Sequence, residues 1–387
     1  MSGQTNETGI YSPHFWLLCT SSLLFFASFN MIIPELPAYL TSLGGEAYKG
    51  LIISLFAITA MLSRPFSGRL ADKLGRVPVI MVGSIVCFIS SLLYPLLSSV
   101  SGFMLLRLVH GFSTGFTPTG QMSYLSDIIP ANRRGEAMGL LGTAGTVGMA
   151  VGPAIGGAIA NNFSFNFLFY CSSFFALTSI VILTGLKETL PSRSRFNVGM
   201  LAIGWKDIFE WRVWVPSVII FLAAYAYGTV LTVIPDFGEH VGIRNKGLLF
   251  TFFTVSSLGI RLLAGRVSDR FGRRNVILVS MTVIASAMVV IALSDRSALL
   301  MLGMSLYGIG HGMTAPTVLA WATDLSLPEL KGRGLATIYI FLELGIGIGA
   351  FLSGLVFHND PANFFLTFFI CATATAIGFL FLLYRKV

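Results

Sequence analysis

The feature that most constrains this chain is an internal repeat. Residues 68–76 read Gly-Arg-Leu-Ala-Asp-Lys-Leu-Gly-Arg, and 197 residues later residues 265–273 read Gly-Arg-Val-Ser-Asp-Arg-Phe-Gly-Arg. When residues 50–79 are aligned with residues 247–276 without a gap, ten of the thirty positions are identical. Self-similarity of this length at a fixed offset indicates two copies of one structural unit in the same orientation.

The composition places both copies in a lipid bilayer. Hydrophobic residues make up 55% of the chain and charged residues only 11%, whereas soluble domains carry roughly 25% charged residues. So few charges cannot cover a surface that faces water. We therefore expect an integral, all-α membrane protein, because helices satisfy their own backbone hydrogen bonds in lipid.

Apolar runs of about twenty residues are long enough to cross a bilayer. The sequence predicts twelve of them, at residues 14–40, 50–70, 77–98, 101–124, 135–160, 164–186, 212–238, 247–267, 275–293, 298–321, 333–357 and 361–384. The predicted organisation is a tail, a six-helix bundle, a central loop and a second six-helix bundle, at residues 1–13, 14–186, 187–211 and 212–387. In the central loop, residues 199–210 are compatible with an interfacial helix.

Lysine and arginine predict the orientation of the chain. With the N-terminus inside, eighteen of these 25 residues lie in cytoplasmic segments, four lie outside and three lie within spans. Cytoplasmic loops of membrane proteins are enriched in basic residues. We therefore expect a multi-pass protein of the plasma membrane, typically a bacterial inner membrane, with both termini in the cytoplasm.

The same patterns exclude other classes of protein. The pI near 9.5 follows from the basic loops, so no nucleic-acid partner is expected. The four cysteines are scattered through apolar runs, which predicts neither a disulfide framework nor a metal site. No nucleophile-and-base motif or phosphate-binding glycine loop is present, so the sequence does not predict an enzyme.

Twelve spans in two sets of six, with Gly-x-x-x-Asp-x-x-Gly-Arg after spans 2 and 8, resemble the major facilitator superfamily. The resemblance covers essentially the whole chain. It implies two six-helix bundles that rock against each other around a central path. It also implies a monomer that uses membrane lipid as solvent and a small molecule as substrate.

The repeated loops predict a gate at the cytoplasmic face. Gly68 is expected to let a neighbouring helix approach closely, and the resemblance implies that Asp72 contacts the opposite half. Loops after spans 4 and 10 add an acid and a base each; the alternative is basic loops that only set topology. The predicted gate comprises Gly68, Asp72, Arg76, Asp127 and Arg134, with the corresponding Gly265, Asp269, Arg273, Asp324 and Arg333.

Span 5 carries a glycine-rich motif. Its residues resemble the motif of the family's exporters, especially proton-coupled drug antiporters, and the corresponding part of span 11 lacks the proline. The alternative is a general helix-packing seam, since small residues favour close helix contacts. The motif comprises Gly148, Gly152, Pro153, Gly156 and Gly157.

Ionisable residues within spans are candidates for the site, because they are costly in lipid. Glu35 in span 1 and Asp236 in span 7 form a symmetric pair that either faces the path or lies in the wet outer rim. Glu343 is alone in the middle of span 11, where burial favours proton exchange; alternatively it pairs with a neighbouring base. Arg107 matches a span-4 motif that the resemblance links to proton coupling.

Arg64 and Arg261 occupy equivalent positions near the cytoplasmic ends of spans 2 and 8. They predict either a structural gate or a site for an anionic substrate. His311 in span 10 is a candidate proton sensor, with a packed, hydrogen-bonded histidine as the alternative.

The sequence thus predicts a secondary transporter that works by alternating access. Proton-coupled export of small hydrophobic or amphipathic molecules is the preferred function, and a symporter or facilitator for an organic anion or sugar is the alternative. Protons are the expected coupling ion, and no cofactor is expected.

Overall fold

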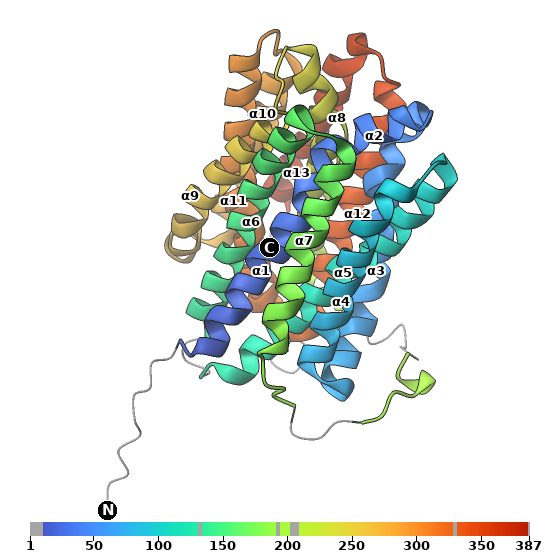
Figure 1. The fold of residues 1–387 in the computed structure, drawn as a ribbon. Helices are drawn as coiled ribbons and strands as arrows, with labels where there is room; N and C mark the ends of the chain where they lie inside the picture. The colour runs from blue at the N-terminus through green and yellow to red at the C-terminus, as the bar shows by residue number, and fades with distance from the viewer. Residues whose placement is uncertain (1–10, 131–133, 191–193, 202–208, 328–330, 386–387) are drawn as a thin grey trace, which may run out of the picture.

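The computed structural model describes residues 11–130, 134–190, 194–201, 209–327 and 331–385. This part of the chain is almost entirely helical and contains no strand (Figure 1). The helices of the first repeat are α1 (Pro13–Ile32), α2 (Leu36–Ser42), α3 (Lys49–Leu74), α4 (Arg76–Leu93), α5 (Val100–Ile128), α6 (Arg134–Asn162) and α7 (Phe165–Thr184). Those of the second are α8 (Trp214–His240), α9 (Gly247–Phe271), α10 (Arg273–Ala292), α11 (Ser297–Leu325), α12 (Lys331–Phe357) and α13 (Phe364–Tyr384).

Within the described residues, only the first predicted span is divided into two helices, α1 and α2. A 3₁₀ turn, η1 (Ile33–Glu35), separates α1 from α2. Pro34 and Pro37 lie in this region and have no backbone N–H to continue the α-helical ladder. Each of the other eleven predicted spans coincides with one long helix to within a few residues, which confirms the twelve-helix, all-α fold.

Hydropathy alone detects fewer crossings than the helices do. Within the described residues, nine helical segments are long and apolar enough to cross a membrane. Helices α5 and α11 fall below that level because much of their buried surface consists of Gly, Ser, Thr and similar small or polar residues. Small residues at such positions let neighbouring helices pack closely in lipid.

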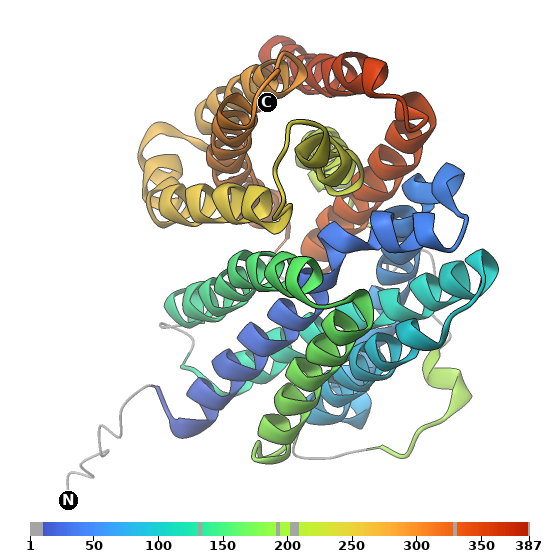
Figure 2. The same cartoon turned by 45° about the horizontal axis from the view of Figure 1, so that its top comes forward.

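The two repeats pack in the same way. In the first, α1 packs on α6 and α3 on α5; in the second, α8 packs on α12 and α9 on α11. Figure 2 shows the result as two groups of helices, blue to green and yellow to red. Contacts between the two groups are made mainly by α3 with α12 and by α6 with α9.

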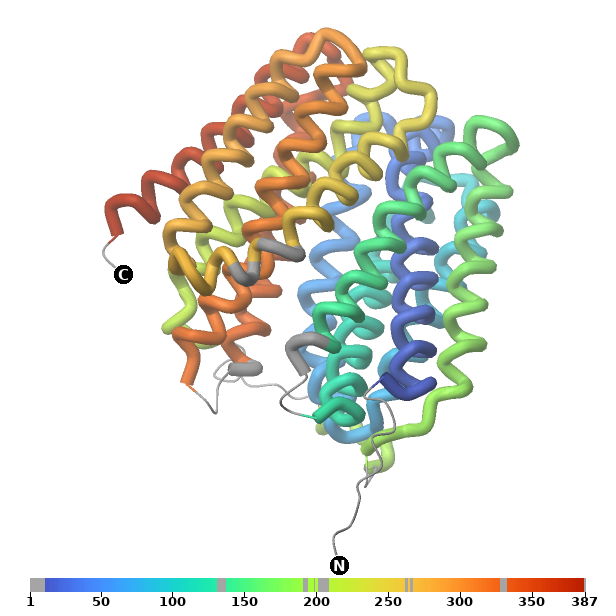
Figure 3. The backbone as a smooth tube through the Cα atoms, turned by 90° about the vertical axis from the view of Figure 1, so that its left-hand side faces the viewer, coloured from blue at the N-terminus to red at the C-terminus, as the bar shows by residue number. Residues whose placement is uncertain are grey.

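The two groups do not lie equally close at both ends. We call the end that carries the turns at Gly75 and Gly272 the motif end, and the opposite end, with residues 43–48 and 241–246, the far end. Figure 3 shows the groups in contact towards the far end and separated towards the motif end. Of the central loop, residues 198–201 form a 3₁₀ turn (η5, Val198–Leu201), and most of the interfacial helix suggested for 199–210 lies outside the described residues.

Candidate transport path and its gates

The far end is sealed where backbones of the two halves cross. A Cβ atom on Gly247 would overlap the carbonyl oxygen of Pro153 in α6. At the equivalent crossing, a Cβ on Gly50 would lie 2.8 Å from the carbonyl oxygen of Ala350 in α12. Because such distances leave no room for a side chain, the halves meet through main-chain atoms at both crossings, that of α6 with α9 and that of α3 with α12.

Polar contacts reinforce this seal. Lys49 Nζ lies 2.9 Å from Asp236 Oδ2 and so joins α3 of one half to α8 of the other. The side chain of Asn245 donates to the carbonyl oxygen of Ala154 at 3.1 Å, and Asn161 donates to that of Arg244 at 2.9 Å. The structure is therefore closed at the far end.

The two acids predicted as a symmetric pair at this end have different environments. Asp236 forms the ion pair with Lys49, whereas Glu35 is only 5% exposed and its Oε1 has no hydrogen-bond partner within the described residues. Lys246, the repeat equivalent of Lys49, pairs with Glu239 of its own half at 2.6 Å. Of the two predicted acids, only Asp236 forms an ion pair that links the halves among the described residues.

At the motif end the charges that recur in both repeats form one network per half. In the first half, Arg76 Nη1 lies 2.5 Å from Asp72 Oδ1, and Arg76 Nε lies 3.0 Å from Asp127 Oδ2. The second half has the same two contacts at the same distances, from Arg273 to Asp269 and Asp324. The structure thus assigns the partners of these loop charges, and both networks stay within their own half.

The predicted contact of Asp72 with the opposite half is not formed in this conformation. The side chain of Asp72 is 70% exposed. The close approach predicted at Gly68 is also wrong here, because a Cβ on that residue would be 4.0 Å from its nearest neighbour, Thr119 Cγ2. Both results have one physical reason, since the halves are separated at this end (Figure 3).

Other parts of the predicted gate are only partly described. Arg333 lies in the first turn of α12. The side-chain surroundings of Arg134 and Gly265 lie outside what the structure describes.

The glycine motif of α6 faces two different partners. A Cβ on Gly148, Gly152 or Gly156 would overlap main-chain atoms of α1 in the same half. Pro153 and Gly157 instead face the α8–α9 connection of the other half. In α12, Gly345 and Gly349 pack on α8 in the same manner as the first set, so that part of the motif is a packing seam present in both halves.

Between the two ends, one ion pair of the described residues crosses from one half to the other. Arg64 Nη2 on α3 lies 2.5 Å from Glu343 Oε1 on α12, with side-chain exposures of 17% and 9%. The guanidinium of Arg64 also lies 4.8 Å from the ring centre of Tyr339. Glu343 is therefore paired with a base in this conformation, and its role in proton exchange stays a prediction.

The equivalent arginine makes the equivalent crossing to a neutral residue. Arg261 Nη1 on α9 donates to Thr146 Oγ1 on α6 at 3.3 Å. Thr146 lies 197 residues before Glu343, so the two crossings are related by the same offset as the loop motif. The repeat supplied the signal for Thr146, which the sequence analysis did not use.

Arg107 lies outside this central region, deep within the first half. It is fully buried and donates to the carbonyl oxygen of Ile52 at 2.8 Å and to the hydroxyl of Tyr94 at 3.3 Å. Its guanidinium lies 4.6 Å from the ring centre of Phe56, and His110 Nδ1 is 3.3 Å from the same tyrosine hydroxyl. The geometry places Arg107 in a cluster between α3, α4 and α5.

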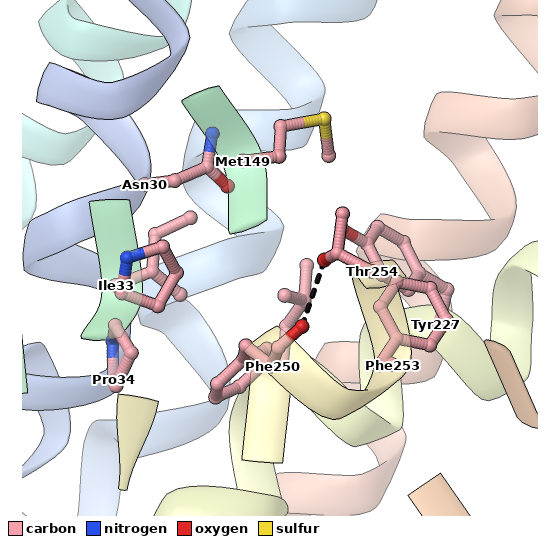
Figure 4. A pocket seen from close by; sticks show the side chains of 10 residues that line it. Asn30, Ile33, Pro34, Met149, Tyr227, Phe250, Phe253 and Thr254 are labelled. Atoms are coloured by element: carbon pink, nitrogen blue, oxygen red, sulfur yellow. Dashed lines mark hydrogen bonds between the residues drawn. The ribbon is translucent and has the colours of Figure 1, made fainter. Parts of the chain in front are cut away.

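His311 lies in an aromatic cluster of the second half. Its ring stacks on Tyr227 with centroids 5.0 Å apart and lies 5.3 Å from the ring of Phe253. Its Nδ1 has no hydrogen-bond partner within the described residues, so the predicted alternative of a hydrogen-bonded histidine is not met at that atom. Tyr227 and Phe253 also line a small, mainly apolar cavity between the halves (Figure 4).

Helices α1, α6, α8 and α9 all contribute to that cavity, together with the turn at Pro34. Its volume of about 10 Å³ is near the minimum for one water molecule. The path is therefore nearly filled at this level, directly below the far-end seal formed by Pro153 and Gly247.

Two related helical sets, sealed at one end and joined across the centre by a buried ion pair, define a polytopic membrane transporter. The chain belongs to the Major Facilitator Superfamily, whose family model matches residues 18–244 and 216–387. The protein is therefore a multi-pass transporter and not an enzyme.

Relatives and solved structures agree with that assignment. The chain is 26% identical over 344 residues to the uncharacterized transporter YhhS of Escherichia coli K12, covering 86% of this chain and 83% of that one. It is 24% identical over 378 residues to Multidrug resistance protein 1 of Bacillus subtilis, covering 94% and 93%. The crystal structure of the human organic anion transporter MFSD10 shares the fold, with a TM-score of 0.74 at 18% identity over 96% of this chain and 100% of that one. Within the family, the chain thus resembles the multidrug efflux branch.

Proposed function

We propose that this protein exports small hydrophobic or amphipathic molecules in exchange for protons, by alternating access. Its similarity to Multidrug resistance protein 1 supports export. The resemblance of the α6 motif to that of antiporters supports the same direction. The observation that carries the proton coupling is the ion pair between Arg64 and Glu343, which links the two halves at the centre of the molecule.

The physical argument rests on what a proton does to this pair. A charged Glu343 attracts Arg64 strongly where little water screens the two groups. A proton on the carboxylate removes that attraction and leaves the guanidinium with Tyr339 alone. Because the pair spans α3 and α12, protonation changes the relative stability of the two arrangements of the halves.

The described conformation then corresponds to the state after proton release. The far end is closed and Glu343 is paired, so the substrate enters from the motif end. Opening of the far end exposes Glu343 to the other side of the membrane, where it takes up a proton while the substrate leaves. Return to the described conformation delivers that proton at the motif end.

The proposed setting follows from the distribution of charge along the sequence. We place the motif end and both termini in the cytoplasm and the protein in a bacterial inner membrane. We propose a monomer that needs no cofactor other than the coupling proton and whose partners are its substrate and membrane lipids.

The test uses proteoliposomes loaded with a cationic dye, an uncharged amphipath or an organic anion, under an imposed pH gradient. The wild type should transport at least one probe against its gradient, and Glu343→Gln should lose this response while still exchanging the probe across the membrane. Glu239→Gln is the matched control, because that acid pairs within its own half and is 66% exposed. Transport by the Glu343→Gln variant that still responds to the pH gradient would contradict the proposed coupling.

A second function, import of an organic anion, is favoured by one observation. Arg261 has no carboxylate partner within the described residues. The same assay separates the two directions, since an importer accumulates the anion when the proton gradient is reversed.

A further inference from the structure

The two equivalent arginines at the centre differ in the charge that faces them. Arg64 faces the carboxylate of Glu343, and Arg261 faces the hydroxyl of Thr146. The two acceptors occupy equivalent positions of α12 and α6. The repeat thus provides an internal comparison, in which one guanidinium is neutralised by the protein and the other is not.

An unpaired guanidinium at this depth is energetically expensive. Arginine stays protonated in proteins, and a charge in the membrane interior is costly unless it is paired. Nε of both arginines is buried without a hydrogen-bond partner within the described residues. The two differ at their terminal nitrogens, because Arg64 lies 2.5 Å from a carboxylate oxygen whereas the bond of Arg261 to the Thr146 hydroxyl is long at 3.3 Å. Arg261 therefore retains donors that are not used in this conformation.

The surroundings of Arg261 are suited to an amphipathic ligand. Thr146 is three residues from Met149 on α6, and Arg261 is seven residues from Thr254 on α9. Such spacings place residues on one face of a helix. Both Met149 and Thr254 line the cavity between the halves, together with the ring of Tyr227 (Figure 4). A charged donor and an apolar path wall thus follow one another along the same two helices.

We propose that Arg261, positioned by Thr146, binds the carboxylate of an amphipathic anion, and that such anions are the preferred substrates. This inference rests on the proposed export function and specifies its substrate class. The planar guanidinium donates two parallel hydrogen bonds to a carboxylate. The Thr146 hydroxyl donates to the carbonyl oxygen of Gly142 at 2.8 Å and accepts from Arg261, so it orients the guanidinium as a neutral acceptor that a carboxylate can replace. The ligand does for Arg261 what Glu343 does for Arg64, while its apolar body lies toward Tyr227 and Phe253.

The test compares two probes that differ only in charge, 2-naphthoate and its uncharged amide. Binding of each is measured at pH 7 with the full-length protein in nanodiscs. The wild type should bind the carboxylate roughly ten- to a hundredfold more tightly than the amide, as expected for charge-assisted hydrogen bonds. Arg261→Gln should lose this preference.

The decisive variant is Thr146→Glu, which places a carboxylate opposite Arg261 in the manner of Glu343. It should remove the preference for naphthoate, whereas the isosteric Thr146→Gln should retain most of it. An unchanged preference in Thr146→Glu, or equal binding of both probes by the wild type, would overturn the inference. Size-exclusion profiles and melting temperatures confirm that each variant is folded.

The outcome is independent of proton coupling. If naphthoate is preferred but no probe responds to a pH gradient, the proposed coupling fails and the anion site stands. If gradient-driven export of uncharged probes is found without a preference for naphthoate, the anion site fails and the proposed function stands.

Discussion

At the scale of single residues, two glycines end the α3 and α9 helices in a conformation that other residues avoid. Gly75 has a φ of +128° and Gly272 a φ of +85°, at equivalent positions of the two repeats. Gly75 also lies against Glu188, whose carboxylate accepts hydrogen bonds from the backbone N–H groups of Arg76 and Val77 at 2.9 and 3.1 Å. Glu188 therefore caps the first turn of α4 from the segment that follows α7.

Because Gly75 lies against Glu188 and Gly272 has no such neighbour, the same substitution should have unequal effects at the two positions. Alanine at either glycine should cost about 1–3 kcal/mol, because the backbone conformation is strained for any residue with a Cβ. Gly75→Ala should cost more than Gly272→Ala, since its Cβ would lie only 2.5 Å from Glu188 Oε2, whereas a Cβ on Gly272 meets nothing within 4 Å. Thermal unfolding followed by tryptophan fluorescence measures both, and equal losses would speak against the role of Glu188.

At the scale of elements, α6 serves two neighbours with two sets of residues. One set packs against α1 and keeps the half together, and the other meets the opposite half at the far end. The sequence offered an antiporter motif and a packing seam as alternatives. The structure places residues of the motif in both kinds of contact, and the seam recurs in α12 without the proline.

The same substitution at two glycines of α6 should change the stability of the protein by different amounts, because one glycine is closely packed and the other is not. Gly148→Val should destabilise the protein by about 1–3 kcal/mol, the usual cost of overpacking, because its Cβ meets the main chain of α1. Gly142→Val on the same helix is the control, since nothing lies within 4 Å of a Cβ there. Melting temperatures in one detergent compare the two variants, and similar values for both would argue against the seam.

At the scale of the whole molecule, the far end and the motif end are in opposite states. Backbone crossings and the pair of Lys49 with Asp236 hold the far end shut. The loop charges at the motif end are satisfied within each half. Alternating access then requires that the far-end contacts be exchanged for contacts at the motif end.

A side chain at one far-end crossing should shift that equilibrium. Gly247→Val places atoms where the carbonyl oxygen of Pro153 lies and should favour a molecule opened at the far end, with slower transport. Spin labels on the exposed Phe163 and Asp295, one in each half, report the change as a longer distance. Gly259→Val in the same helix has open space around its Cβ and is the control. The same distance distribution in both variants would contradict the seal.

The sequence was sufficient for the architecture because hydropathy and the repeat act over long windows. Twelve spans and the all-α fold follow from apolar length and composition. Contacts between halves depend on which helix faces meet, which periodicity does not determine. Glu343 therefore looked isolated although Arg64 lies 279 positions away in the chain and 2.5 Å away in space.

The sequence predicted most residues of the candidate site but not which of them contact each other. Arg64, Arg261 and Glu343 were all candidates, but Thr146 is an ordinary buried threonine until the offset is applied to it. Arg107 matched a motif, yet its partners lie elsewhere in the chain, Phe56 in α3 and Tyr94 at the end of α4. Sequence spacing does not bring these residues together. Roles in coupling and binding for these residues remain predictions that the experiments above test.

The glycine crossings at the far end have a consequence for the range of cargo. At the two glycine crossings the halves meet through carbonyl groups and Cα atoms, which have no side-chain rotamers to rearrange each time the far end opens and closes, while polar side chains such as Lys49 and Asp236 separate beside them. Under the proposed export function, the far end is the exit, and it opens in the same way for compounds of different shape, so that selectivity is set deeper in the molecule.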